Sequence, residues 1–123
     1  MNILLVDDSR IMRNIVKNTL VTHPRFAAVQ YFEAGDGVTA LGMIESRTID
    51  LLLLDWNMPG INGLELVKHL RGKPEFANLP IIMITSEAAK YNVIEAVKAG
   101  VNDYLVKPVS DKALLEKIER IGL

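Results

Sequence analysis

The stretch that decides the fold runs from residue 49 to residue 60 and reads IDLLLLDWNMPG. Residues 49–54 form an almost unbroken apolar run, which is typical of a strand covered on both faces in a parallel sheet. Similar runs occur at positions 3–6, 27–32, 80–84 and 103–106. The sequence therefore predicts five short strands buried within a parallel sheet.

Segments with a helical period of apolar residues separate these runs. The apolar stripes are Met12/Ile15/Val16/Thr19/Leu20, Val38/Leu41/Ile44, Leu64/Val67/Leu70, Val93/Ile94/Val97 and Leu114/Leu115/Ile118/Ile121. Ser9 is placed to cap the first helix, and Gly100 and Gly122 follow the last two where glycine often ends a helix. Strands that alternate with helices through short connections predict one three-layer α/β domain over residues 1–123.

The composition excludes several classes of function. The chain has 123 residues, no cysteine and a formal net charge of −1. Disulfides, thiolate catalysis and cysteine-bound zinc are therefore excluded, and no basic surface favours nucleic acid. No apolar run is long enough to span a bilayer, and the two aspartates after residue 6 are unlike a signal peptide. We expect a cytoplasmic protein.

Polar side chains follow four of the predicted strands where each strand ends. Asp7 and Asp8 follow the first strand, Asp55 the third, Thr85 ends the fourth and Lys107 follows the fifth. Ligands of open parallel sheets bind at the carboxyl ends of the strands, so these groups are expected to converge there. Clustered carboxylates suit Mg²⁺, and a carboxylate can be the nucleophile of phosphoryl transfer. The set fits transfer of a phosphoryl group onto Asp55, aided by a metal, a hydroxyl and an ammonium.

Five motifs lie at the strand ends in the order in which one protein family has them. They are Val6-Asp7-Asp8-Ser9, Asp55-Trp56-Asn57-Met58-Pro59, Gly63-Leu64-Glu65-Leu66, Met83-Ile84-Thr85-Ser86-Glu87-Ala88 and Tyr104-Leu105-Val106-Lys107-Pro108. On these motifs the chain resembles a response-regulator receiver domain of the CheY-like, single-domain chemotaxis type, over essentially its whole length. The resemblance implies a flavodoxin-like sandwich with five helices and the strand order 2-1-3-4-5 of that family.

The resemblance also implies a role for each matching position at the site. Asp55 is the expected phospho-acceptor of a two-component phosphorelay, supplied by a CheA-like histidine kinase. Lys107 is expected to pair with the phosphoryl oxygens, and a cis peptide before Pro108 is implied. Strand alternation lets only one of Thr85 and Ser86 face the site, and the resemblance favours Thr85. The expected Mg²⁺ ligands are Asp8, Asp55, the backbone carbonyl of Asn57 and, through water, Asp7.

An output surface is implied in the same way. Tyr104 is expected to move inward with Thr85, which changes the surface formed by the fourth helix, the fifth strand and the fifth helix. In chemotaxis proteins of this type that surface binds the flagellar motor switch. Lys90, Val93 and Lys117 stand at the positions that meet this partner.

Other implications concern the molecule as a whole. We expect a monomer that controls flagellar rotation without touching nucleic acid or membrane. Its only catalysis is expected to be transfer to, and hydrolysis from, its own Asp55. Val109 departs from the family, in which an aromatic residue commonly follows the Lys-Pro pair, so part of the output surface is expected to differ.

Several alternatives stay open at this point. One alternative is the receiver part of a truncated transcriptional regulator, although Trp56, Asn57 and Glu87 are closer to chemotaxis proteins by resemblance. Met1 directly before the first strand and the lack of a final linker favour a single-domain protein. A phosphate sink without an output partner is a further reading. A small Mg²⁺-dependent phosphatase with an aspartate nucleophile would place that residue after the first strand, in an Asp-x-Asp pattern that Asp7-Asp8-Ser9 lacks. A flavin mononucleotide carrier would need a hydroxyl-rich loop where the two aspartates stand.

Overall fold

Five parallel strands form the centre of the structure, a computed structural model that describes residues 1–122 and leaves Leu123, the predicted domain end, outside the described residues. The strands are β1 (Asn2–Val6), β2 (Gln30–Ala34), β3 (Leu51–Leu54), β4 (Ile81–Thr85) and β5 (Asp103–Val106). The helices are α1 (Arg10–Val21), α2 (Gly37–Ser46), α3 (Gly63–Arg71), α4 (Lys90–Ala99) and α5 (Asp111–Ile121), with a short 3-10 turn η1 (Pro74–Phe76).

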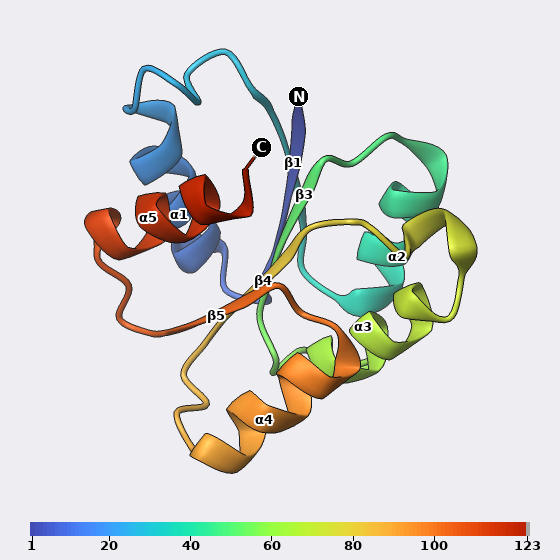
Figure 1. Cartoon of the computed structure of the whole chain (residues 1–123). Coiled ribbons are helices and arrows are strands. Elements are labelled where there is room, and N and C mark those ends of the chain that lie inside the picture. Colours follow the sequence, from blue (N-terminus) through green and yellow to red (C-terminus); the bar gives the residue numbers. More distant parts are fainter. Residues whose placement is uncertain (123) are drawn as a thin grey trace.

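The sheet order is β2-β1-β3-β4-β5, with every neighbouring pair parallel. Figure 1 shows α1 and α5 together on one side of the sheet, with α2, α3 and α4 on the other. The predicted three-layer sandwich, its five helices and its strand order are therefore confirmed. No helix within residues 1–122 has the length and apolar character needed to cross a membrane.

Successive strand residues are buried on opposite faces of the sheet, which explains the unbroken apolar runs. One core cluster joins Leu4, Leu52 and Ile81 to α2, α3 and α4. The other joins Leu5 and Leu53, among others, to α1 and α5. Both clusters consist of buried, mainly aliphatic side chains, so hydrophobic burial on two faces holds the central strands in place.

The helix ends follow the capping signals. Ser9 accepts a hydrogen bond from the Met12 backbone N–H at the start of α1, as predicted. Gly100 ends α4 with φ 119°, a left-handed conformation that side chains other than glycine rarely adopt. Gly122 likewise follows α5 with a positive φ.

Some local predictions were wrong. Ile15 on α1 and Val38 on α2, both members of predicted apolar stripes, are 48% and 66% exposed. The second strand begins at Gln30, three residues later than predicted, because residues before it form a turn around the fully buried Phe26. On α4 the buried residue is Ala96, whereas Ile94 and Val97 of the predicted core stripe are 42% and 56% exposed. A small side chain at the contact lets α4 pack closely against its neighbours, and the larger apolar groups are left at the surface.

Candidate functional site

The candidate site lies at the carboxyl edge of the sheet. The residues directly after β1 and β3 still make the hydrogen bonds of the parallel sheet there. The Asp55 backbone N–H donates to the Val6 carbonyl at 2.9 Å, and the Asp7 N–H donates to the Ala34 carbonyl at 3.1 Å. Because these hydrogen bonds continue the parallel ladders, they fix the backbone of both aspartates at the sheet edge. The sheet therefore holds two carboxylates of different strands side by side.

Three carboxylates meet at this edge, as predicted. One oxygen from each of Asp7, Asp8 and Asp55 lies within 4.8 Å of the others. Asp7 and Asp55 are buried, and Asp8 is exposed. Like charges this close repel one another, so the arrangement costs stability unless a cation is nearby. Hard oxygen ligands in this number suit a divalent cation such as Mg²⁺, and the cluster is compatible with such a site.

Within residues 1–122, Lys107 is the only lysine whose ammonium group contacts the buried carboxylates of Asp7 and Asp55. Its Nζ donates to Asp7 Oδ2 at 2.7 Å and to Asp55 Oδ2 at 3.0 Å. Burial alone would lower the pKa of Lys107, but the hydrogen bonds and charges of the two aspartates outweigh it and raise the pKa. The peptide before Pro108 is cis, as predicted. Lys107 thus contacts two of the three clustered carboxylates.

Thr85 and Ser86 differ as strand alternation requires. Thr85 is completely buried, whereas Ser86 is exposed. The Thr85 hydroxyl accepts a hydrogen bond from the Glu87 backbone N–H at 3.3 Å. Among the described residues it makes no hydrogen bond to Asp55 or Lys107, so its predicted contact with a phosphoryl group stays a prediction.

Glu87 connects the site to α4 and β5, and no periodic pattern pointed to this connection. Its carboxylate accepts from the side-chain amide of Asn57 at 2.8 Å and from that of Asn92 at 3.2 Å. Its backbone carbonyl accepts from the Tyr104 hydroxyl at 2.6 Å. Glu87 therefore forms hydrogen bonds with three separate segments: the loop after β3, the start of α4, and β5. The only signal in the sequence was the position of Glu87, two residues beyond Thr85.

The predicted output residues lie at the β5 edge of the sheet, on α4, β5 and α5. Tyr104 is half-buried, and burial first, then the charges of Glu87 and Asp55, raise its pKa. Lys90 is exposed at the first position of α4, and Val93 is half-buried. Lys117 is paired, with its Nζ 3.1 Å from Asp103 Oδ1.

Exposed apolar side chains accompany these residues. On α4 and β5 they are Tyr91, Ile94, Val97 and Val106. Their gathering on two neighbouring elements was missed, because the helical period of α4 was interpreted as a core stripe. An exposed apolar patch of this kind is typical of a surface that binds another protein.

Trp56, the only tryptophan, adjoins the site. Its backbone N–H donates to Asp55 Oδ1 at 2.7 Å, and its ring packs partly buried against the α2–α4 core. The Asp55 carboxylate thus accepts one hydrogen bond from Trp56 and one from Lys107. Trp56 is a natural reporter of changes at this carboxylate.

A doubly wound parallel sheet with an acidic cluster and a lysine at its carboxyl edge defines the class of the chain as a receiver-like α/β domain. The model of the response regulator receiver domain family matches residues 3–119. The chain therefore belongs to the response regulator receiver family, and it is of the CheY type.

Relatives and solved structures agree with this assignment. Chemotaxis protein CheY-3 of Vibrio cholerae is 47% identical over 121 residues, covering 98% of this chain and 91% of the relative. The crystal structure of V. cholerae chemotaxis protein CheY4 has a TM-score of 0.86 at 32% identity, covering 98% of this chain and 97% of that one. The Mn²⁺-bound form of response regulator Rcp1 has a TM-score of 0.81 at 26% identity, covering 98% and 90% of the two chains.

Proposed function

We propose that this chain is a phosphorylation-controlled chemotaxis switch, in which Asp55 accepts a phosphoryl group from a histidine kinase of the CheA kind. The observation that carries the proposal is the meeting of three carboxylates with Lys107 at one sheet edge. The domain is taken to span residues 1–123 and to act as a cytoplasmic monomer. Its catalysis is confined to the formation and hydrolysis of its own aspartyl phosphate.

The proposed chemistry is a single displacement at phosphorus. A carboxylate oxygen of Asp55 attacks the phosphorus of a phosphohistidine on the donor. The new O–P bond forms as the N–P bond breaks, and the imidazole nitrogen keeps the electron pair and takes a proton. Lys107, already in contact with Asp55 Oδ2, is placed to follow the charge that moves onto the phosphoryl oxygens.

A divalent cation completes the proposed site. Asp7, Asp8 and Asp55 would hold Mg²⁺, with the backbone carbonyl of Asn57 as a further ligand, and the ion would offset the charge of the phosphoryl oxygens. The structural relative Rcp1 was crystallised in a Mn²⁺-bound form, which supports a divalent-cation site in this family. The chain's own carboxylates supply the negative charge that attracts the ion.

The proposed output is a change of the α4–β5–α5 surface. A phosphoryl group at Asp55 adds charge and acceptor oxygens that Thr85 and Lys107 would satisfy. Since Glu87 bonds the Thr85 hydroxyl, Asn92 and Tyr104, a shift of Thr85 would be passed to α4 and β5. Lys90, Val93, Tyr104 and Lys117 would then alter the surface offered to a partner. For a CheY-type chain we propose that this partner is the flagellar motor switch.

The fluorescence of Trp56 tests the proposal. We expect a saturable change on addition of Mg²⁺, and a second change when beryllium fluoride, a phosphoryl mimic, is added in the presence of Mg²⁺. The variant Asp55→Ala should lose the second change while remaining folded by circular dichroism. A beryllium fluoride response of equal size in Asp55→Ala would contradict Asp55 as the acceptor.

A second variant tests the role of Lys107. Lys107→Ala should still accept a phosphoryl group, because the nucleophile is retained, but the switch should be weakened. Normal partner binding by phosphorylated Lys107→Ala would count against a role for this ammonium in the switch.

A further inference from the structure

Asp7 is held by hydrogen bonds at each of its side-chain and carbonyl oxygens. Its Oδ1 accepts from the Ser9 backbone N–H at 2.9 Å, and its Oδ2 accepts from Lys107 Nζ at 2.7 Å. Its backbone carbonyl accepts from Arg13 Nη1 at 2.5 Å. The first two bonds act on the side chain, whereas the bond from Arg13 is the only one among residues 1–122 that acts on the peptide group leading into Asp8. The geometry of the Asp7–Asp8 turn thus depends on a guanidinium one helical turn away.

Arg13 is itself fixed by a second contact. It lies on the first half of α1 with only 16% of its side chain exposed, and its Nε donates to Glu33 Oε1 at 3.0 Å. Glu33 belongs to β2, the strand next to β1 in the sheet. A guanidinium presents its donors in a rigid planar fork, so two acceptors at fixed positions define its orientation. Arg13 therefore ties the Asp7 carbonyl to the end of β2.

The Asp8 side chain, unlike that of Asp7, is not held by hydrogen bonds within residues 1–122. Its side chain is exposed, and the described residues offer it no hydrogen bond, although one of its oxygens belongs to the three-carboxylate cluster. The direction of the Asp8 carboxylate is therefore set by the backbone before it. Groups that orient metal ligands without touching the metal commonly change metal affinity when they are removed.

We propose that Arg13 is a positioning residue of the divalent-cation site, acting through the backbone carbonyl of Asp7 to aim the Asp7 and Asp8 carboxylates. The inference rests on the proposed function, because it takes the three-carboxylate cluster to be a cation site. It assigns to α1 a role in cation binding through a residue that carries no ligand atom.

The sign of the effect separates positioning from simple electrostatics. Arg13 is a cation near three carboxylates, so removing its charge would by itself strengthen the binding of another cation. Positioning predicts the opposite, a weaker site. Lys17 provides the matched control, because its Nζ lies 3.8 Å from Glu33 Oε2 and, within residues 1–122, it makes no hydrogen bond or ion pair with Asp7. Lys17→Met removes one positive charge from the same helix and leaves the Asp7 carbonyl bonded.

The test is a Mg²⁺ titration of the full chain followed by Trp56 fluorescence, with urea unfolding of each variant in metal-free buffer. Arg13→Met should raise the Mg²⁺ dissociation constant about tenfold, the lower end of the range for groups that orient metal ligands. Arg13→Lys, which keeps the charge and one donor, should recover part of the affinity. Lys17→Met should bind Mg²⁺ as wild type does or slightly more tightly.

The outcomes are distinguishable from one another. Unchanged or tighter Mg²⁺ binding by Arg13→Met, with wild type binding normally, would overturn the positioning role and leave the proposed function intact. No saturable Mg²⁺ response in wild type would overturn both. If Arg13→Met does not fold, Glu33→Gln keeps the test decisive, because it loosens the guanidinium while retaining it. An affinity equal to that of wild type in Glu33→Gln and in Arg13→Lys would then refute the inference.

Discussion

The two ends of the sheet use their polar groups in opposite ways. At the amino end, the Arg71 guanidinium is matched by carbonyl groups: it donates to those of Gly100, Phe76 and Leu79 at 2.7–3.0 Å. At the carboxyl end, three carboxylates share one described ammonium. Hydrogen bonds of this kind stabilise the amino end, whereas the clustered carboxylates at the carboxyl end repel one another, an arrangement that is compatible with a divalent-cation site.

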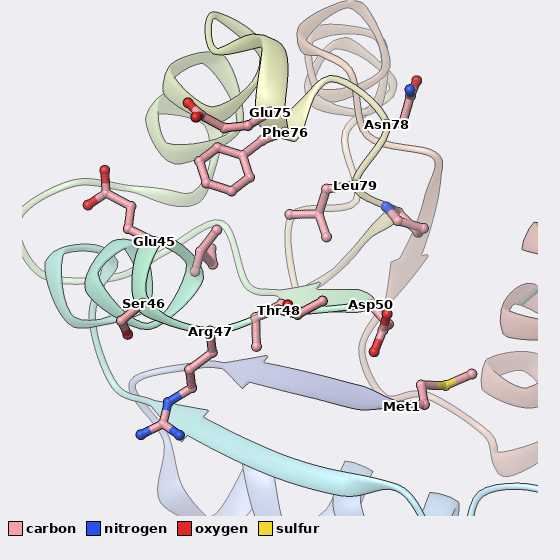
Figure 2. A pocket seen from close by; sticks show the side chains of 13 residues that line it. Met1, Glu45, Ser46, Arg47, Thr48, Asp50, Glu75, Phe76, Asn78 and Leu79 are labelled. Atoms are coloured by element: carbon pink, nitrogen blue, oxygen red, sulfur yellow. The ribbon is translucent and has the colours of Figure 1, made fainter.

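The volume of a cavity does not show which end of the sheet is the functional one. A cavity of about 850 Å³ lies at the amino end, lined by residues of the α2–β3 and α3–β4 connections together with Met1. Figure 2 shows Glu45, Arg47, Asp50 and Glu75 spread around it rather than directed at one point. Glu45 is paired with Lys73 at 2.9 Å, and Asp50 accepts from the Asn2 backbone N–H at 2.7 Å. The carboxyl end is distinguished by charged side chains that meet at one point, not by the volume of a cavity.

The largest change in stability is expected at Gly63, where α3 packs directly against the backbone of the site at the carboxyl end. Gly63 starts α3 so close to the acceptor strand that an added Cβ would collide with the backbone of Asp55 and Trp56. Gly63→Ala should lower the free energy of unfolding by about 3 kcal/mol and disturb the acceptor. Urea unfolding measures this, with Gly42→Ala as control.

Gly42 lies inside α2 with no atom within 4 Å of an added Cβ, so Gly42→Ala should stabilise by about 0.5–1 kcal/mol. If the two alanine variants were equally stable, the close approach of α3 to Asp55 would not constrain the site.

A smaller loss is expected at the amino end. Arg71→Met removes the hydrogen bonds that join the end of α3 to the segments before β4 and β5, and should cost about 2 kcal/mol of unfolding free energy. Its Mg²⁺ affinity should stay within about twofold of wild type, because the site is at the other end of the sheet.

Lys68 supplies the control for Arg71. Lys68→Met changes an exposed cation on the same helix and should alter stability by less than about 0.5 kcal/mol. A tenfold loss of Mg²⁺ affinity in Arg71→Met would show that the two ends are coupled and would break the comparison.

A gain in stability is expected when the repulsion among the three carboxylates is reduced. Asp8→Asn removes one carboxylate from the cluster without losing a described hydrogen bond, and should raise stability in metal-free buffer by about 0.5 kcal/mol. The same variant should bind Mg²⁺ at least about tenfold more weakly, because a charged ligand is lost. Paired urea and Mg²⁺ titrations measure both quantities. Loss of stability in the metal-free variant would mean that Asp8 is not under repulsion.

The smallest effect is expected in the amino-end cavity. Glu75→Gln removes an exposed charge there and should change stability by less than about 0.5 kcal/mol, with Mg²⁺ affinity unchanged. It is the charge-matched partner of Asp8→Asn. A weaker Mg²⁺ response in Glu75→Gln would assign a role to this cavity that its chemistry does not indicate.

The regular part of the fold was predictable from pattern. Continuous apolar runs located the strands, since burial on both faces leaves no alternation, and the carboxyl-end rule brought Asp7, Asp55 and Lys107 together. The strand order came from the resemblance to receiver domains and not from the pattern itself. Capping by Ser9 was correctly predicted because it depends on neighbours in sequence.

The rest depended on contacts that no local pattern records. Arg13, Arg71 and Glu87 act through backbone carbonyls or side chains distant in sequence, so their identity alone did not reveal their partners. The exposed stripe of α4 was misassigned because a docking surface and a core face share one helical period. Three-dimensional placement was needed to separate them.

The most direct test of the central claim is the intact mass of the protein after incubation with acetyl phosphate. With Mg²⁺, wild type should gain the mass of one phosphoryl group, and with a chelator in place of Mg²⁺ the gain should nearly disappear. Asp55→Asn should show no gain under either condition. A phosphoryl group that forms equally well without a divalent cation, or that appears on Asp55→Asn, would contradict the account of the carboxyl end as a cation-dependent acceptor site.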